Sequence, residues 1–144
     1  MSAHRLTRLF LKCSRATSAV EFAIVMPVFL VMLFGIISFG AYLALTHEVQ
    51  QIAAEAARAS IGGLSDDERA SLARDSITAN AATYPMLTPE RLTVVSAVTD
   101  PTTNVFAVTL SYDASNMYLF DLPQFVSALP TRIVRAASIK RGGF

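Results

Sequence analysis

Hydrophobic positions near the N-terminus form an unbroken run rather than a periodic pattern. No residue from Phe22 to Thr46 is charged. A helix over this run covers roughly 37 Å at about 1.5 Å per residue, and the hydrocarbon core of a bilayer is about 30 Å thick. The run therefore predicts one transmembrane helix.

Beyond the run, apolar positions become periodic with helical spacing. No Pro or Gly interrupts the chain between His47 and Ser60, and this stretch is rich in alanine, the strongest helix former. The Gly62-Gly63 pair marks the end of the helix. We therefore predict a helix over residues 17–61, half in lipid and half outside. One face of its outer half is predicted to pack against a head domain or against neighbouring helices; it holds Leu45, Val49, Ile52, Ala53, Ala56 and Ser60.

The remaining segment, residues 62–144, predicts a small head that begins with a helix. Ser65 and Glu68 have the spacing of a capping box, so a helix is expected from there to about Ala82. The acidic cluster at 66–68 is interpreted as a helix start rather than a metal site, because acidic residues favour the positive end of the helix dipole.

Alternating positions then predict strands over 92–98 and 105–112, joined as a hairpin by a turn at 100–104, and a last strand over 131–141. Residues 117–120 are read as a short strand or an apolar loop, and 123–129 as a short helix. One face of the second strand is predicted to be buried and holds Phe106, Val108, Leu110 and Tyr112. The predicted fold class is α+β, a long transmembrane helix that extends into a head with a helix and a short antiparallel sheet.

Composition narrows the class of protein. Hydrophobic residues make up 53% and charged residues 16%, against about a quarter charged in soluble domains, which excludes an ordinary cytosolic globular protein. The net charge of +1 gives no basic surface for nucleic acid. The single cysteine, Cys13, allows no intrachain disulfide, and the histidines are His4 and His47. We therefore expect no enzyme, no metal and no cofactor.

Charges flanking the run predict its orientation. Arg5, Arg8, Lys12 and Arg15 precede it without any acidic residue. The positive-inside rule places this leader, residues 1–16, in the cytoplasm and the head outside. A secretory signal peptide cleaved near Gly40 is the alternative. It is disfavoured because the apolar run exceeds the usual 7–15 residues and its helix continues.

Glu21 is a carboxylate directly before the apolar run. One interpretation leaves it in the lipid headgroup region, where its cost is small. The other pairs it with a chain end created at Thr17, since residues four apart are neighbours on a helix. The same amine could instead meet Glu21 of an adjacent subunit.

Residues 15–27, Arg-Ala-Thr-Ser-Ala-Val-Glu-Phe-Ala-Ile-Val-Met-Pro, resemble the TadE-like pseudopilins, relatives of type IV pilins. The resemblance implies cleavage between Ala16 and Thr17 by a prepilin peptidase, and roles for Glu21, Phe22 and Pro27 in processing or assembly. It implies a minor pseudopilin in the bacterial inner membrane. Its partners would be other minor pseudopilins, the major Flp pilin, membrane lipid and the platform that assembles the tight-adherence (Flp) pilus. Whether it sits at the pilus tip, at the base or in a priming complex is left open.

Two positions depart from the family pattern. Ala16 stands where the family usually has Gly, and Ser38 replaces an acidic residue in Gly35–Gly40. Pro27 is either a simple kink or a soft spot that lets the helix stretch on leaving the membrane. The alternative function is an uncleaved single-pass anchor that carries an extracytoplasmic adaptor or sensor domain.

Overall fold

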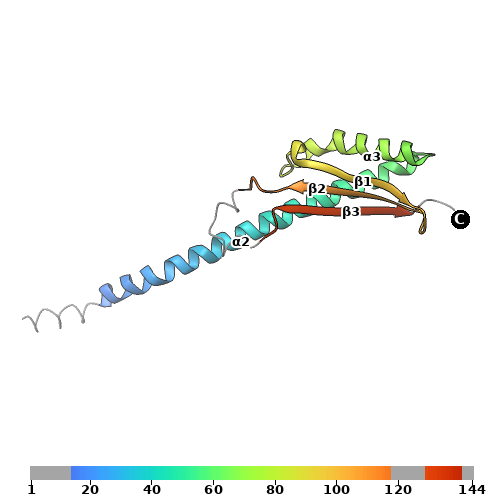
Figure 1. Ribbon diagram of the computed structural model, residues 1–144. Coiled ribbons are helices and arrows are strands. Elements are labelled where there is room, and N and C mark those ends of the chain that lie inside the picture. The colour runs from blue at the N-terminus through green and yellow to red at the C-terminus, as the bar shows by residue number, and fades with distance from the viewer. Residues whose placement is uncertain (1–13, 118–128, 141–144) are drawn as a thin grey trace, which may run out of the picture. The chain divides into compact units, whose positions relative to one another are not determined.

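The computed structural model describes residues 14–117 and 129–140, with side chains from Ser18 onward. The elements follow in the order α2 (Ser14–Ala59), η1 (Ser60–Gly62), α3 (Asp66–Asn80), η2 (Ala81–Thr83), η3 (Pro89–Arg91), β1 (Leu92–Asp100), β2 (Val105–Asp113) and β3 (Arg132–Lys140) (Figure 1). The predicted α+β class is confirmed. The predictions for residues 1–13, 118–128 and 141–144 lie outside the described residues, which leaves the short helix at 123–129 untested.

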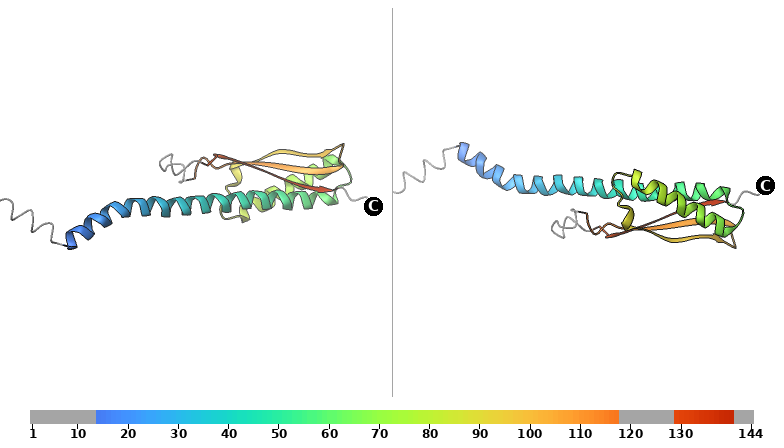
Figure 2. Two further views of the ribbon diagram at one scale, coloured as in Figure 1. Left: turned by 90° about the horizontal axis from the view of Figure 1, so that it is seen from below. Right: turned by 90° about the horizontal axis from the view of Figure 1, so that it is seen from above.

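Two compact units make up the chain, residues 1–38 and 39–144. In the first unit the structure describes residues 14–38, all of which belong to α2. The helix continues through Pro27 without a break. Its blue part curves in both views of Figure 2. By length and composition, the helical stretch from Ser18 onward is able to cross a membrane.

In the second unit, α2 buries one face against the head. All six residues predicted on this face are buried, from Leu45 at 1% exposure to Ser60 at 0%. Apart from the adjacent pair Ile52 and Ala53, they recur every three or four residues, which is the spacing that keeps side chains on one face of a helix. The periodic face of the sequence is thus the wall of the head's core.

The sheet is an antiparallel meander in which β2 lies between β1 and β3. Its register pairs Leu92 with Tyr112 and Asp113 with Arg132, and a bulge between Val94 and Ser96 interrupts the first pair of strands. Both helices lie on the same side of the sheet in Figure 2. The four predicted inward residues of β2 are buried, at 0–4% exposure, so the core forms between this face and the helices.

Local polar contacts begin α3 and turn the hairpin. Ser65 caps the helix by accepting a hydrogen bond from the Glu68 amide (3.2 Å), and Glu68 accepts one from the Leu64 amide (2.8 Å). The predicted capping box is confirmed, although its second contact reaches one residue further back. In the hairpin, the Asp100 carboxylate accepts hydrogen bonds from Thr102 and Thr103, and these lower its pKa.

The connection from α2 to α3 depends on a glycine and a buried arginine. Arg69 is 8% exposed, and its Nε donates to the Gly63 carbonyl oxygen at 2.9 Å. A Cβ on Gly63 would lie 2.6 Å from Arg69 Cγ and 2.7 Å from its backbone nitrogen. The close approach of the two segments therefore requires glycine at this position.

Candidate functional site

The residues predicted for processing and assembly all lie on α2. The helix begins at Ser14, so it is continuous across the expected cut between Ala16 and Thr17. Thr17 and Glu21 are four residues apart on one helix, which places them on the same face. Phe22 follows Glu21 directly, and Pro27 lies less than two turns further on. These positions thus lie on one continuous helix.

The surface around Glu21 is apolar and open. Val20, Phe22, Ile24 and Val28 are each exposed by 60% or more, and Glu21 is exposed among them. Comparable exposure continues along α2 to Phe39. Monomeric soluble proteins rarely expose an apolar patch larger than a few hundred square ångströms. This half of the helix therefore suits contact with lipid or with other apolar helices.

Just beyond the uncharged run, polar side chains fasten α2 to the rest of the head. Glu48 accepts a hydrogen bond from the Met86 amide at 3.1 Å. Gln50 Nε2 donates to the Ala136 carbonyl oxygen of β3, also at 3.1 Å. The two contacts reach the connection after η2 and the third strand, so helix and sheet are joined where the apolar run ends.

Tyr84 adds a third contact in this region. Burial raises the pKa of its hydroxyl to about 12, with a hydrogen bond to Glu55 and the negative charges of Glu55 and Glu48 contributing in the same direction. A hydroxyl held this way stays protonated over the whole physiological range. It therefore places a neutral hydroxyl beside Glu55 of α2.

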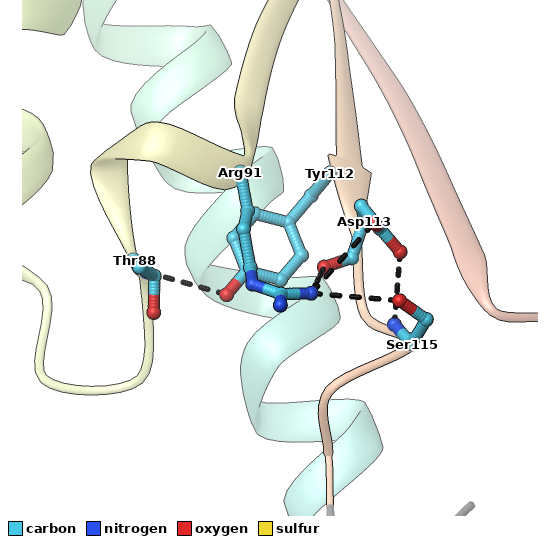
Figure 3. A network of polar contacts seen from close by, with 5 residues as sticks. All are labelled: Thr88, Arg91, Tyr112, Asp113 and Ser115. Atoms are coloured by element: carbon cyan, nitrogen blue, oxygen red, sulfur yellow. Dashed lines mark hydrogen bonds and ion pairs between the residues drawn. The ribbon is translucent and has the colours of Figure 1, made fainter.

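A network around Arg91 joins η3 to the end of β2 (Figure 3). Arg91 Nη1 lies 3.6 Å from Asp113 Oδ2 and donates to the Asp113 carbonyl oxygen (3.4 Å) and to Ser115 Oγ (3.5 Å). The Thr88 amide donates to the Tyr112 hydroxyl at 3.2 Å. Hydrogen bonds from Ser115, with a smaller contribution from Arg91 and Arg132, lower the pKa of Asp113. The network fixes the end of the strand.

Within residues 14–117 and 129–140, no group of three His, Cys, Asp or Glu side chains lies close enough to hold a metal ion. Asp66, part of the acidic cluster at the start of α3, accepts a hydrogen bond from Thr99 at 2.7 Å instead.

A comparison with protein-family models matches most of α2. The family model described as TadE-like protein matches residues 16–58. This segment of the chain is TadE-like. No curated protein and no solved structure matches the chain. The matched segment lies within α2, which is long and apolar enough to cross a membrane.

The TadE-like segment begins at Ala16, the residue before the expected cut, and ends at Arg58, one residue before the last residue of α2. It therefore contains Thr17, Glu21, Phe22 and Pro27. It also contains the buried face that packs against the sheet, so it contributes both to the apolar surface and to the core of the head.

Ser38, a departure from the TadE-like pattern, is 2% exposed. An ionised carboxylate at so buried a position would lose its hydration, which is costly unless it is paired. Serine avoids that cost. The substitution is thus compatible with the packing of this chain.

The sequence did not predict the contacts of two residues that join α2 to the rest of the head. Gln50 and Arg69 each bind a backbone carbonyl oxygen far along the chain or across a turn. Helical periodicity assigns such residues only to a face. Their partners depend on strand register and on the approach at Gly63, which no local pattern encodes.

Proposed function

We propose that this protein is a minor pseudopilin of the tight-adherence (Flp) pilus. A prepilin peptidase cleaves it between Ala16 and Thr17, and it resides in the inner membrane with its N-terminus in the cytoplasm and its head outside. There it joins other minor pseudopilins and the major Flp pilin on the assembly platform. The observation that carries the proposal is the TadE-like match over residues 16–58, which coincides with one continuous helix whose first half exposes apolar side chains.

In this proposal the protein is a structural component and a peptidase substrate, not a catalyst. Nucleophilic hydrolysis by a Ser-His-Asp arrangement needs a histidine beside the nucleophile. The sequence has His4 in the leader and His47 at the end of the apolar run, and none in the head beyond it.

Glu21 has a specific task in the proposed assembly. After cleavage, the amine of Thr17 lies one helical turn before the Glu21 carboxylate, or meets the Glu21 of a neighbouring subunit. Pairing neutralises two charges that are each costly in an apolar bundle. The pair sets the axial position of one subunit relative to the next.

The first test is the intact mass and N-terminal residue of the membrane-extracted protein, from cells with and without the prepilin peptidase. A chain that starts at Thr17 only when the peptidase is present is the expected result. An uncut chain in both strains contradicts the proposal.

A second test separates assembly from insertion. Replacing Glu21 by Gln removes the charge but keeps the shape of the side chain, so membrane insertion should persist while pilus yield falls at least about tenfold, as expected if a charge pair worth at least about 1.4 kcal/mol is lost. Glu90→Gln, an exposed acid in η3, is the matched control and should leave the yield unchanged. Normal yield from the Glu21 variant would show that the pair is dispensable.

The uncleaved anchor is the second candidate. Two observations favour it: α2 runs without interruption across the expected cut, and Ala16 replaces the family's glycine. A peptidase must unwind a helical site before cutting it. In this case the protein is a single-pass adaptor or sensor, and the same mass measurement identifies it.

A further inference from the structure

An open hollow of about 590 Å³ lies where α2 leaves the apolar run. Its residues come from α2 and from β3, which Gln50 joins directly by its hydrogen bond to Ala136 (Figure 1). The hollow is lined by Leu43, Ala44, Thr46, His47, Gln50 and Arg135. All of these belong to the unit formed by residues 39–144.

The length of the apolar run sets the depth of this hollow. If Phe22 lies at one edge of the hydrocarbon core, a core about 30 Å thick ends about 20 residues later at 1.5 Å per residue. That point is near Tyr42. The headgroup layer on each side is about 5–7.5 Å deep. The stretch from Leu43 to His47 then lies in this layer on the side of the head, and Gln50 lies just beyond it, whichever way the helix is oriented.

The hollow combines one fixed positive charge with a neutral donor and an apolar wall. Arg135 is half-buried, and one of its guanidinium nitrogens donates to the Val134 carbonyl oxygen at 2.8 Å. In the part of the chain that the structure describes, no carboxylate lies within ion-pair distance of Arg135. No acidic residue lines the hollow, while Leu43 and Ala44 are both apolar. A guanidinium group binds phosphate oxygens in a bidentate manner.

Gln50 adds a neutral donor to the hollow. The hydrogen bond to Ala136 holds Gln50 in place, with the second N–H of its amide still able to donate. Thr46 also lines the hollow, but its hydroxyl oxygen is buried and is not open to a ligand there.

We propose that this hollow binds an anionic phospholipid in the leaflet on the side of the head. Arg135 binds the phosphodiester, with Gln50 as an additional donor, and the first acyl methylenes lie against Leu43 and Ala44. The bound lipid fixes the depth of the head at the membrane surface. A lipid is the occupant because the site lies in the headgroup layer and pairs a phosphate-binding cation with an apolar wall.

Native mass spectrometry of the full chain, released from mixed micelles of phosphatidylglycerol and phosphatidylcholine, tests this site. The wild type should retain phosphatidylglycerol in preference to phosphatidylcholine. In Arg135→Gln the retained fraction should fall about fivefold, as expected when one cationic group is lost at headgroup level. Arg132→Gln is the matched control, because this exposed residue has the same charge and lies on the opposite face of β3.

The control variant separates a specific site from general charge attraction. Unchanged retention in Arg132→Gln supports the site. Arg135→Lys keeps the charge and should retain at least half as much phosphatidylglycerol as the wild type. Equal losses in Arg132→Gln and Arg135→Gln overturn it. The proposal is also overturned if inorganic phosphate, added in plain detergent, binds and displaces the lipid. The hollow would then be a site for the free ion.

A photoactivatable phosphatidylglycerol provides a measurement that needs no variant. In liposomes it should label the peptide that contains Leu43–Gln50 at least threefold more than the peptide that contains Val105–Asp113, which lies in the middle strand of the sheet. Equal labelling of the two peptides contradicts the proposal. Neither result depends on pilus assembly, so failure here leaves the proposed function untouched.

Discussion

The two halves of α2 are one helix built for different surroundings. Between Val20 and Phe39, apolar side chains point outward in every direction, and most are exposed by 40% or more. From Leu45 to Ser60, the buried residues form one face, and the other faces hold Gln51, Arg58 and similar polar groups. A helix that is apolar all round needs an apolar environment, whereas a one-sided helix needs a single packing partner.

The same secondary structure is therefore stabilised in two ways. The second half depends on the sheet, which supplies Phe106, Val108 and Leu110 to the shared core. Among the described residues of its own unit, 14–38, the first half has no such partner, so its stability depends on lipid or on neighbouring helices. Substitutions should therefore act on different properties in each half.

The largest effect is expected from a phenylalanine at the centre of the head. Phe106 is fully buried, so Phe106→Ala leaves a cavity and should lower the free energy of unfolding by about 3–5 kcal/mol. Phe34, 50% exposed in the first half of α2, is the matched control. Denaturant unfolding of the full chain in detergent measures both, and Phe34→Ala should leave the head transition unchanged.

This prediction fails if the two alanine variants unfold the head with the same midpoint. That result would mean that Phe34 also packs in the head, or that Phe106 contributes little to it. Either way, the contrast between the two halves of the helix would be lost.

A charge placed in each half tests the expected environment directly. Met32 is 66% exposed and lies near the middle of the uncharged run. Met32→Arg should raise the apparent free energy of membrane insertion by about 2.5–3.5 kcal/mol. Gln51→Arg, at an exposed position in the second half, should change it by less than about 0.5 kcal/mol.

A glycosylation-mapping insertion assay measures these values. Wild-type insertion of the Met32 variant would show that this stretch does not occupy the bilayer centre. A large effect at Gln51 would extend the membrane-spanning segment beyond Thr46 and would also place the lipid hollow inside the hydrocarbon core.

Much of the fold was predictable because the spacing of apolar residues indicates which face of a helix or strand is buried. The face of α2 from Leu45 to Ser60 and the inward face of β2 are buried as expected. The cap at Ser65 and the turn after Asp100 could also be predicted from the sequence, because their contacts join residues within four positions of each other. Local chemistry is enough for such features.

Contacts between distant residues were not predictable in the same way. The order β1-β2-β3, the bond from Gln50 to Ala136 and the packing of Arg69 on Gly63 depend on how the elements meet. At the candidate site, the sequence identified Glu21 and its apolar neighbours by position alone. It did not identify the hollow at Arg135, because that residue reaches α2 only through the register of β3.

The smallest predicted effect concerns Tyr84, which connects the second half of α2 to the chain after η2. Its pKa is about 12 in the folded protein and about 10 in an unfolded chain. The folded state therefore holds the proton more tightly, and the resulting stability is present below pH 10 and lost as the pH rises to 12. Because Tyr84 is partly open to water, we expect a loss of no more than about 1 kcal/mol.

Tyr84→Phe cannot ionise, so the difference in unfolding free energy between it and the wild type should change over this interval, as measured by denaturant titrations at pH 9 and 12. A difference that stays constant would mean that the hydroxyl ionises equally in both states. The environment of Tyr84 beside Glu55 would then add no stability to the packed half of the helix.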